Sequence, residues 1–255
     1  MPSYCKIQSR LVEVQFLSEL VSLHNIYYVD LLEVTLMNDI DLPVEIIERA
    51  ETTRGEIQLQ RRGDAYEIIS NGTFLMATYN GESERLLVRR ALELVPSPDK
   101  VLIGGLGVGF SLQEALRDPR VREATVVEIE AKVIEWNRSE LAPVNDHALG
   151  HAKTRLIHAD LIAWIRETAE TFDLICLDID NGPDWKVFDG NASLYDDAGL
   201  EALRSRLRPG GCLSFWSATP SPDFAQRLRE AFGNVEIHEV PQSHGDPDYI
   251  FYVRE

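Results

Sequence analysis

The chain has 255 residues, of which 44% are hydrophobic and 26% charged, and its formal net charge is −17. Such an acidic chain repels phosphates, so nucleic acid is a poor partner and a cationic small molecule a better one, although the acid excess also serves solubility alone. Three scattered cysteines are too few for a disulfide framework or a metal site. No apolar run is long enough to predict a membrane span. Because the sequence also shows no signal-peptide pattern, we expect a cytoplasmic protein.

The sequence pattern divides residues 1–98 into two segments. Residues 1–36 are apolar but only loosely periodic, so we interpret them as an N-terminal extension that packs weakly or not at all. Residues 37–98 predict a small β domain with a linking helix. Strand-like runs between 55 and 80 flank Asn71-Gly72, a strong signal for a two-residue hairpin, and a helical pattern then ends before Pro96.

Residues 99–255 alternate between strand and helix patterns. Repeated strand–helix units predict an α/β domain whose mostly parallel sheet carries helices on both faces. A final pair of strand patterns has no helix between its members, so these two strands must pair antiparallel. The expected strands are 101–105, 124–128, 155–159, 173–178 and 211–217, and the expected helices are 110–117, 131–140, 161–168, 195–207 and 222–232.

A glycine-rich loop follows the first of these strands, in "VLIGGLGVGF", with Gly105, Gly107 and Gly109 at alternate positions. Open α/β sheets bind ligands at the carboxyl ends of their strands, and glycine allows a ligand close to the backbone. A dinucleotide fingerprint would need glycine where Phe110 stands, and no P-loop lysine follows. The loop therefore indicates a ligand of another kind, or only tight strand–helix packing.

Two acidic residues follow the next two strands. Glu128 ends "TVVE", 23 positions after Gly105, where a carboxylate can accept both hydroxyl groups of a ribose. Asp160 follows "LIHA" and can accept from an adenine amino group, or cap the helix that starts after it. The two roles of Asp160 are compatible.

A second pair of acids, Asp178 and Asp180, lies at the end of the fourth strand in "FDLICLDIDNGPDW". Beside a bound adenosyl group they could hold or deprotonate an amine. The alternative is a turn that these acids initiate before Gly182-Pro183.

The order of these motifs, together with "SLYDDAGLEALRSRLRPGGCL", resembles the spermidine synthase (polyamine aminopropyltransferase) family, a branch of the class I S-adenosylmethionine-dependent methyltransferase fold. The resemblance implies a Rossmann-like sheet of seven strands with an antiparallel last strand, and a small N-terminal β-hairpin domain. It implies an adenosyl site made of the glycine loop, Glu128 with Ile129 at the ribose, Asp160 with Leu161 at the adenine, and Asp178.

The chain departs from that family at the positions that bind amines. The family carries GGGDGG, whose Asp holds the amino end of the donor's aminopropyl arm, and in the run "GLGVGF" this place falls on Val108. The second Asp of the family's D-x-x-D-P motif falls on Asn181, or on Asp180 with a one-residue gap. Glu82 and Glu84 stand where the family has a Tyr-His or Tyr-Gln pair. With Asn181 and Tyr195, these two acids are our expected acceptor contacts.

The sequence therefore predicts a transferase that uses S-adenosylmethionine and needs no metal. Because Val108 carries no charge, the expected reaction is methyl (alkyl) transfer to a small acceptor, such as an amine, with Asp180 as first and Asp178 as second candidate for the base. One alternative is aminopropyl transfer from decarboxylated S-adenosylmethionine, as in polyamine synthesis. Another is a non-catalytic binding protein with the same fold. The resemblance also makes a homodimer an expectation.

Overall fold

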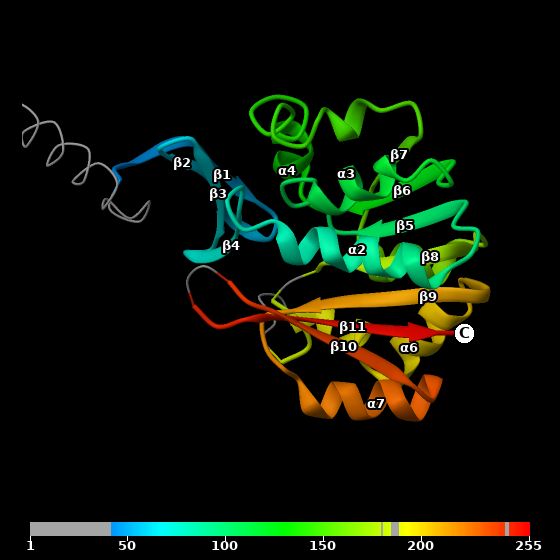
Figure 1. Ribbon diagram of the computed structural model, residues 1–255. Coiled ribbons are helices and arrows are strands. Elements are labelled where there is room, and N and C mark those ends of the chain that lie inside the picture. The colour runs from blue at the N-terminus through cyan, green and yellow to red at the C-terminus, as the bar shows by residue number, and fades with distance from the viewer. Residues whose placement is uncertain (1–41, 180, 185–188, 243–244) are drawn as a thin grey trace, which may run out of the picture. The chain divides into compact units, whose positions relative to one another are not determined.

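Four strands near the start of the chain form an antiparallel sheet of their own, shown in blue and cyan in Figure 1. The computed structural model describes residues 42–179, 181–184, 189–242 and 245–255, so the extension expected at residues 1–36 lies outside the described residues. The predicted hairpin is confirmed: Asn71 and Gly72 join two paired strands, and both have positive φ, 49° and 76°. In sheet order, the strands are β1 (Val44–Thr52), β2 (Gly55–Arg62), β3 (Ala65–Ser70) and β4 (Thr73–Ala77).

The second sheet has seven strands in the order β10-β11-β9-β8-β5-β6-β7. The predicted class is confirmed, because only β11 runs against its two neighbours, β9 and β10, while the other described pairings are parallel. The strands are β5 (Lys100–Gly104), β6 (Glu123–Glu128), β7 (Thr154–His158), β8 (Phe172–Leu177), β9 (Leu207–Ser217), β10 (Val235–Val240) and β11 (Asp248–Arg254).

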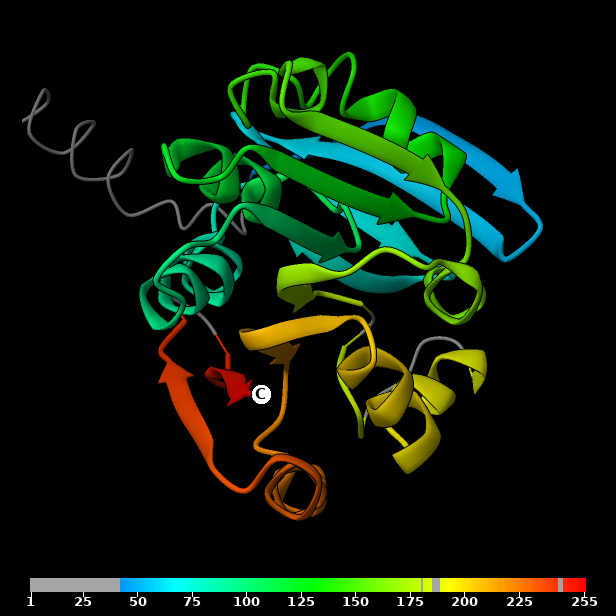
Figure 2. The same ribbon diagram turned by 90° about the vertical axis from the view of Figure 1, so that its right-hand side faces the viewer.

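Helices cover both faces of this sheet (Figures 1 and 2). Successive strand residues point to opposite faces, so Val101 and Ile103 pack under the first helix group while Leu102 packs under the second. The first group is α2 (Glu82–Leu94), α3 (Phe110–Arg117) and α4 (Ala131–Trp136), and the second is α5 (Leu161–Glu167), α6 (Asp197–Arg204) and α7 (Pro222–Phe232). Two short 3-10 helices, η2 (Ala148–Gly150) and η3 (Asp189–Leu194), complete the described elements.

Two helices differ from the pattern expected at 131–140 and 195–207. Helix α4 ends at Trp136, and the following residue, Asn137, turns its side chain inward to accept and donate hydrogen bonds. Helix α6 starts only at Asp197, because the side chain of Asp196 accepts a 2.8 Å hydrogen bond from Gly199 N and caps the helix.

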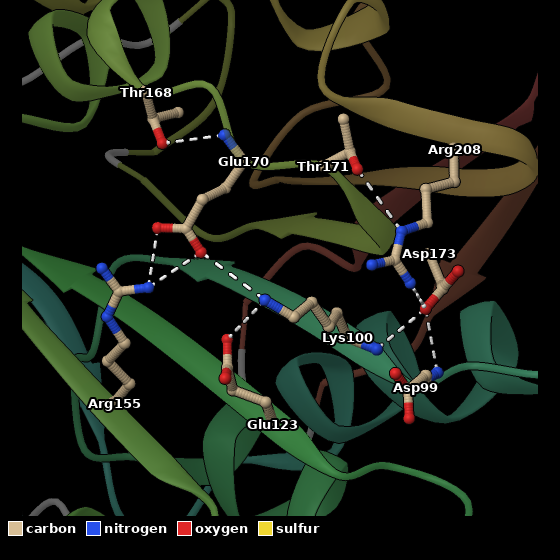
Figure 3. A network of polar contacts seen from close by, with 9 residues as sticks. All are labelled: Asp99, Lys100, Glu123, Arg155, Thr168, Glu170, Thr171, Asp173 and Arg208. Atoms are coloured by element: carbon tan, nitrogen blue, oxygen red, sulfur yellow. Dashed lines mark hydrogen bonds and ion pairs between the residues drawn. The ribbon is translucent and has the colours of Figure 1, made fainter.

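The amino edge of the seven-stranded sheet carries a network of polar contacts (Figure 3). Asp173 of β8 accepts from the backbone N–H groups of Asp99 and Lys100 at 2.9 and 2.8 Å and pairs with Arg208 at 2.9 Å. The Lys100 ammonium lies 3.2 Å from Glu123 and 3.7 Å from Glu170. These contacts join the amino ends of neighbouring strands. Ligands of open α/β sheets bind at the opposite, carboxyl edge.

No helix in the described ranges combines the length and apolar character that crossing a bilayer requires. In the same ranges, no group of three or more His, Cys, Asp or Glu side chains is arranged to hold a metal ion.

Candidate active site

A cavity opens at the carboxyl edge of the large sheet and is closed on one side by the small sheet. Apolar side chains of β2 to β4 form much of that side, and the remaining lining includes the glycine loop, the ends of β6 to β9 and the starts of α2 and α5. Sequence analysis missed the contribution of the small sheet, because its apolar residues read as ordinary core. The lining residues of the small sheet are the apolar Ile57, Ile68, Leu75 and Met76, together with the polar Ser70.

The glycine loop passes between β6 and β8 and contacts both. Gly105 N donates to Val127 O at 3.0 Å, and Asp178 N donates to Gly104 O at 2.9 Å. Gly105 has φ +89°, and a Cβ there would lie 2.1 Å from the carbonyl oxygen of Asp178. Only glycine combines a positive φ with the absence of a Cβ at this close approach. The same residue therefore allows the tight packing against Asp178 and leaves the cavity wall without a side chain.

Gly107, and not the side chain of Val108, lies in the cavity lining. A Cβ at Gly107 would lie 2.2 Å from Met76 Sδ. The side chain of Val108 does not face the cavity as expected, because it is 0% exposed and packs in the hydrophobic core beneath the loop. Gly109 is also absent from the lining: it is the left-handed residue, φ +90°, that precedes α3.

Glu128 lies beneath the loop and is 7% exposed. Its Oε2 accepts from Leu106 N at 2.8 Å and its Oε1 from Glu130 N at 2.7 Å, and both Glu128 and Ile129 line the cavity. Burial raises the pKa of the Glu128 carboxyl, and the backbone N–H donors oppose that rise. Each carboxylate oxygen has further lone pairs, so this group can still accept hydroxyl groups from a ligand.

Asp160 caps helix α5 and also lines the cavity, so the two roles considered for it are compatible. Its Oδ1 accepts from Ile162 N at 2.8 Å and from Ala163 N at 3.3 Å. Leu161, the first residue of α5, lies beside it in the lining.

The end of the cavity next to α2 contains acids. Glu84 is 5% exposed and lines the cavity with Asp178 and Asn181. Behind Glu84, the buried Ser83 hydroxyl lies 2.9 Å from Glu84 Oε2 and 2.7 Å from Asp248 Oδ2. A hydroxyl has one hydrogen, so Ser83 can donate to only one of these two carboxyl groups at a time.

The acids at this end hold protons unusually tightly. Burial, followed by the charge of Asp178, raises the pKa of Glu84 to about 8. Burial, followed by the charge of Asp248, raises the pKa of Asp178 to about 7. Burial also raises the pKa of Asp248. We refer to Glu84, Asp178 and Asp248 as the acid cluster; a cationic ligand would favour its charged form.

Arg54 is the one basic side chain among the described residues of the lining, against five acids. It lies on the turn between β1 and β2 and pairs with Glu130 at 3.3 Å, beside the Glu128 end of the cavity. The acid cluster therefore has no basic neighbour from the described lining.

Two expected site residues, Glu82 and Tyr195, take other positions. Glu82 lies outside the lining, 64% exposed at its side chain, and pairs with Arg89. Tyr195 also lies outside it: its ring packs edge-on to Phe224, centroids 5.4 Å apart, and its hydroxyl donates to Ile179 O at 2.9 Å. The first candidate for the base, Asp180, lies outside the described residues.

Ser83 and Asp248, which meet behind Glu84, are residues that sequence analysis missed. They are 165 positions apart in the chain, and Asp248 opens β11 in a stretch that resembles an ordinary strand start. No local pattern connects the two residues.

Comparison with known proteins agrees with this arrangement. Residues 82–224 match the model of the spermine/spermidine synthase domain. The chain is 30% identical over 166 residues to polyamine aminopropyltransferase 2 of Pseudomonas aeruginosa, covering 61% of this chain and 46% of that protein. It is 35% identical over 138 residues to a polyamine aminopropyltransferase of Saccharolobus islandicus, covering 53% and 44%. The chain spans about half the length of these curated relatives.

Solved structures agree on the fold. A spermidine synthase in complex with the transition state analogue AdoDATO superposes with a TM-score of 0.72 at 20% identity, covering 82% of this chain and 73% of that one. The spermidine synthase of Thermotoga maritima gives a TM-score of 0.69 at 20% identity, with 82% and 72% covered. Since the domain match extends over more than half of the chain, the chain belongs to the spermine/spermidine synthase family.

Proposed function

We propose that this chain transfers an aminopropyl group from decarboxylated S-adenosylmethionine to an amine acceptor. The observation that carries the proposal is the acid cluster at one end of a cavity whose other end holds Glu128 under a glycine loop. The relatives' names as polyamine aminopropyltransferases support it. Methyl transfer is not proposed, because that expectation rested on Val108 facing the donor and the Val108 side chain lies in the core.

The adenosyl group of the donor occupies the end of the cavity lined by Gly105, Glu128 and Asp160 in this proposal. The Glu128 carboxylate accepts from the ribose hydroxyls, with Ile129 beside the sugar. The free oxygen of Asp160 accepts from the adenine amino group, with Leu161 against the ring. The lining positions of all five residues support these assignments.

The amine groups of donor and acceptor occupy the acid cluster. The family's loop aspartate falls on Val108 in the sequence, whose side chain is buried, and Gly107, which lines the cavity, has no side chain. The loop therefore supplies no carboxylate for the aminopropyl ammonium. Glu84 and Asp178 are the lining carboxylates that can accept from it, and Asn181 adds an amide beside them.

The reaction needs a neutral amine and a base. The acceptor nitrogen attacks the propyl carbon bound to sulfur; the N–C bond forms, the C–S bond breaks, and 5′-methylthioadenosine leaves with the bonding electrons. The attacking nitrogen then loses a proton. Asp178, whose pKa is raised to about 7, can take this proton near neutral pH. Asp180, the first candidate from the sequence, lies outside the described residues and stays a candidate on sequence grounds alone.

Titration calorimetry with decarboxylated S-adenosylmethionine, S-adenosylmethionine and 5′-methylthioadenosine tests the proposal. We expect the first and third ligands to bind and the second to bind more weakly, because its carboxylate would approach the acid cluster. Tighter binding of intact S-adenosylmethionine would return the reaction to methyl transfer. No binding of any adenosyl ligand would favour the non-catalytic alternative.

A further inference from the structure

Two buried asparagines lie directly behind the glycine loop, on the side away from the cavity. Asn137 follows the last residue of α4, and Asn145 precedes η2; each is 1% exposed, and neither lines the cavity. Their side chains contact each other, since Asn145 Nδ2 donates to Asn137 Oδ1 at 2.7 Å. A Cβ at Gly109 would lie 2.6 Å from Asn145 Nδ2, so the loop rests against this pair.

Each asparagine holds one carbonyl group of the loop. Asn137 Nδ2 donates to Gly107 O at 2.8 Å and to Val133 O at 2.9 Å. Asn145 Nδ2 donates to Val108 O at 2.9 Å, and its Oδ1 accepts from Ala148 N at 3.1 Å. Backbone carbonyls only accept, so these partners fix which side of each amide is the NH₂ group.

The held carbonyls determine what the loop presents to the cavity. In a trans peptide, the C=O and N–H groups point in opposite directions. Because the Gly107 carbonyl points to Asn137, the N–H group of the same peptide, Val108 N, points to the other side. There it meets Met76 Sδ at 3.1 Å, in the cavity wall. The asparagine pair thus sets the orientation of the peptide that follows the lining residue Gly107.

We propose that Asn137 and Asn145 are positioning residues for the adenosyl donor: they hold the peptides 107–109 so that the loop keeps its cavity face. This inference rests on the proposed function, because it names the donor as the ligand that the loop serves. Both residues act through the loop and touch no substrate. Their loss should weaken donor binding while binding of the amine acceptor, at the acid cluster, is retained.

The variants Asn137→Asp and Asn145→Asp test this with little change in shape. In each, an oxygen replaces the NH₂ group that faces two acceptors, and even a protonated carboxyl supplies one hydrogen where the amide supplied two. We expect affinity for 5′-methylthioadenosine and decarboxylated S-adenosylmethionine to fall about tenfold or more, with the KM of the amine acceptor little changed. Amide hydrogen exchange in residues 105–109 of the ligand-free variants should be faster than in wild type.

Two controls separate positioning from general loss of stability. Asn234→Asp makes the same chemical change at an exposed residue and should alter nothing. Asp173→Asn weakens the polar network at the opposite edge of the sheet and should lower the melting temperature without changing donor affinity. Since the exchange measurement needs no ligand, it remains informative if donor binding proves too weak to measure.

The outcomes distinguish this inference from the proposed function. If wild type binds no adenosyl ligand, the proposed function fails, and the donor role of the pair fails with it. If wild type binds and both variants bind equally well, with exchange in 105–109 unchanged, only the positioning role is overturned. A fall in donor affinity that merely matches that of Asp173→Asn at equal loss of stability would also overturn it.

Discussion

Leu106 N donates a 2.8 Å hydrogen bond to Glu128 Oε2, which ties the glycine loop to the end of the neighbouring strand β6. The second oxygen, Oε1, accepts from Glu130 N at 2.7 Å. One buried carboxylate therefore fixes the backbone on both sides of the predicted ribose site. In the proposed function, this relationship would link the conformation of the loop to donor binding.

The first prediction concerns Glu128→Ala. The ribose would lose a charged acceptor and the loop would lose its anchor, so donor affinity should fall by about 1–3 kcal/mol in binding free energy. Calorimetry with 5′-methylthioadenosine measures the change. Glu123→Gln, on the same strand but at the amino edge, is the control and should bind as wild type. Unchanged affinity in a folded Glu128→Ala protein would remove Glu128 from the donor site.

The second prediction concerns Val108→Asp. Because this side chain is fully buried among apolar neighbours, a carboxylate there has no water and no cation, and the free energy of unfolding should fall by about 3 kcal/mol or more. Val108→Thr, of similar shape but uncharged, should lose less. Thermal unfolding measures both. A stable Val108→Asp protein with altered donor preference would mean that this side chain reaches the cavity after all.

The third prediction concerns Gly107 and Met76. An alanine Cβ at residue 107 would lie 2.2 Å from Met76 Sδ, in addition to the strain of φ +50°. Gly107→Ala should therefore destabilise the chain, and Met76→Ala should relieve part of that loss, with a coupling of about 1 kcal/mol in a double-mutant cycle. Gly150→Ala, where no atom lies within 4 Å of the new Cβ, is the control. Strict additivity would show that the two residues do not meet.

The fold was largely predictable from the sequence because each strand and helix leaves a local pattern. The hairpin at Asn71-Gly72 and the acids Glu128 and Asp160 at strand ends were found in this way, and both acids line the cavity. Two things have no local signal. The first is the direction of neighbouring loop residues: only the packing of the loop shows that Gly107 lines the cavity while the Val108 side chain is buried. The second is the contact of Ser83 with Asp248, which can be predicted only when the order of the strands in the sheet is known.

The fourth prediction concerns pH and Glu84. Its pKa is raised to about 8 in the folded chain, above the ordinary value near 4.5, so the folded state binds this proton more tightly than the unfolded state. The stability that follows is present at low pH and is lost as pH rises from about 4.5 through 8. Glu84→Gln removes this titration, so its free energy of unfolding should fall less than that of wild type between pH 5 and pH 8.5. Denaturant unfolding at both pH values measures the difference, and parallel losses in the two proteins would contradict the assignment.

The fifth prediction concerns the amine end of the cavity. Asp248→Asn removes a carboxylate from the acid cluster while leaving the residues around Glu128 unchanged. The KM of the amine acceptor should rise about tenfold, and affinity for 5′-methylthioadenosine should stay the same. Equal losses for both ligands would mean that Asp248 acts on the whole cavity and not on the amine.

The most direct test is turnover by the wild-type chain with each donor in turn and a set of short primary amines and diamines, followed by mass spectrometry of both products. We expect an aminopropylated amine and an equal amount of 5′-methylthioadenosine from decarboxylated S-adenosylmethionine, and no methylated amine from S-adenosylmethionine. A methylated amine formed from intact S-adenosylmethionine, with no product from the decarboxylated donor, would contradict the proposed function.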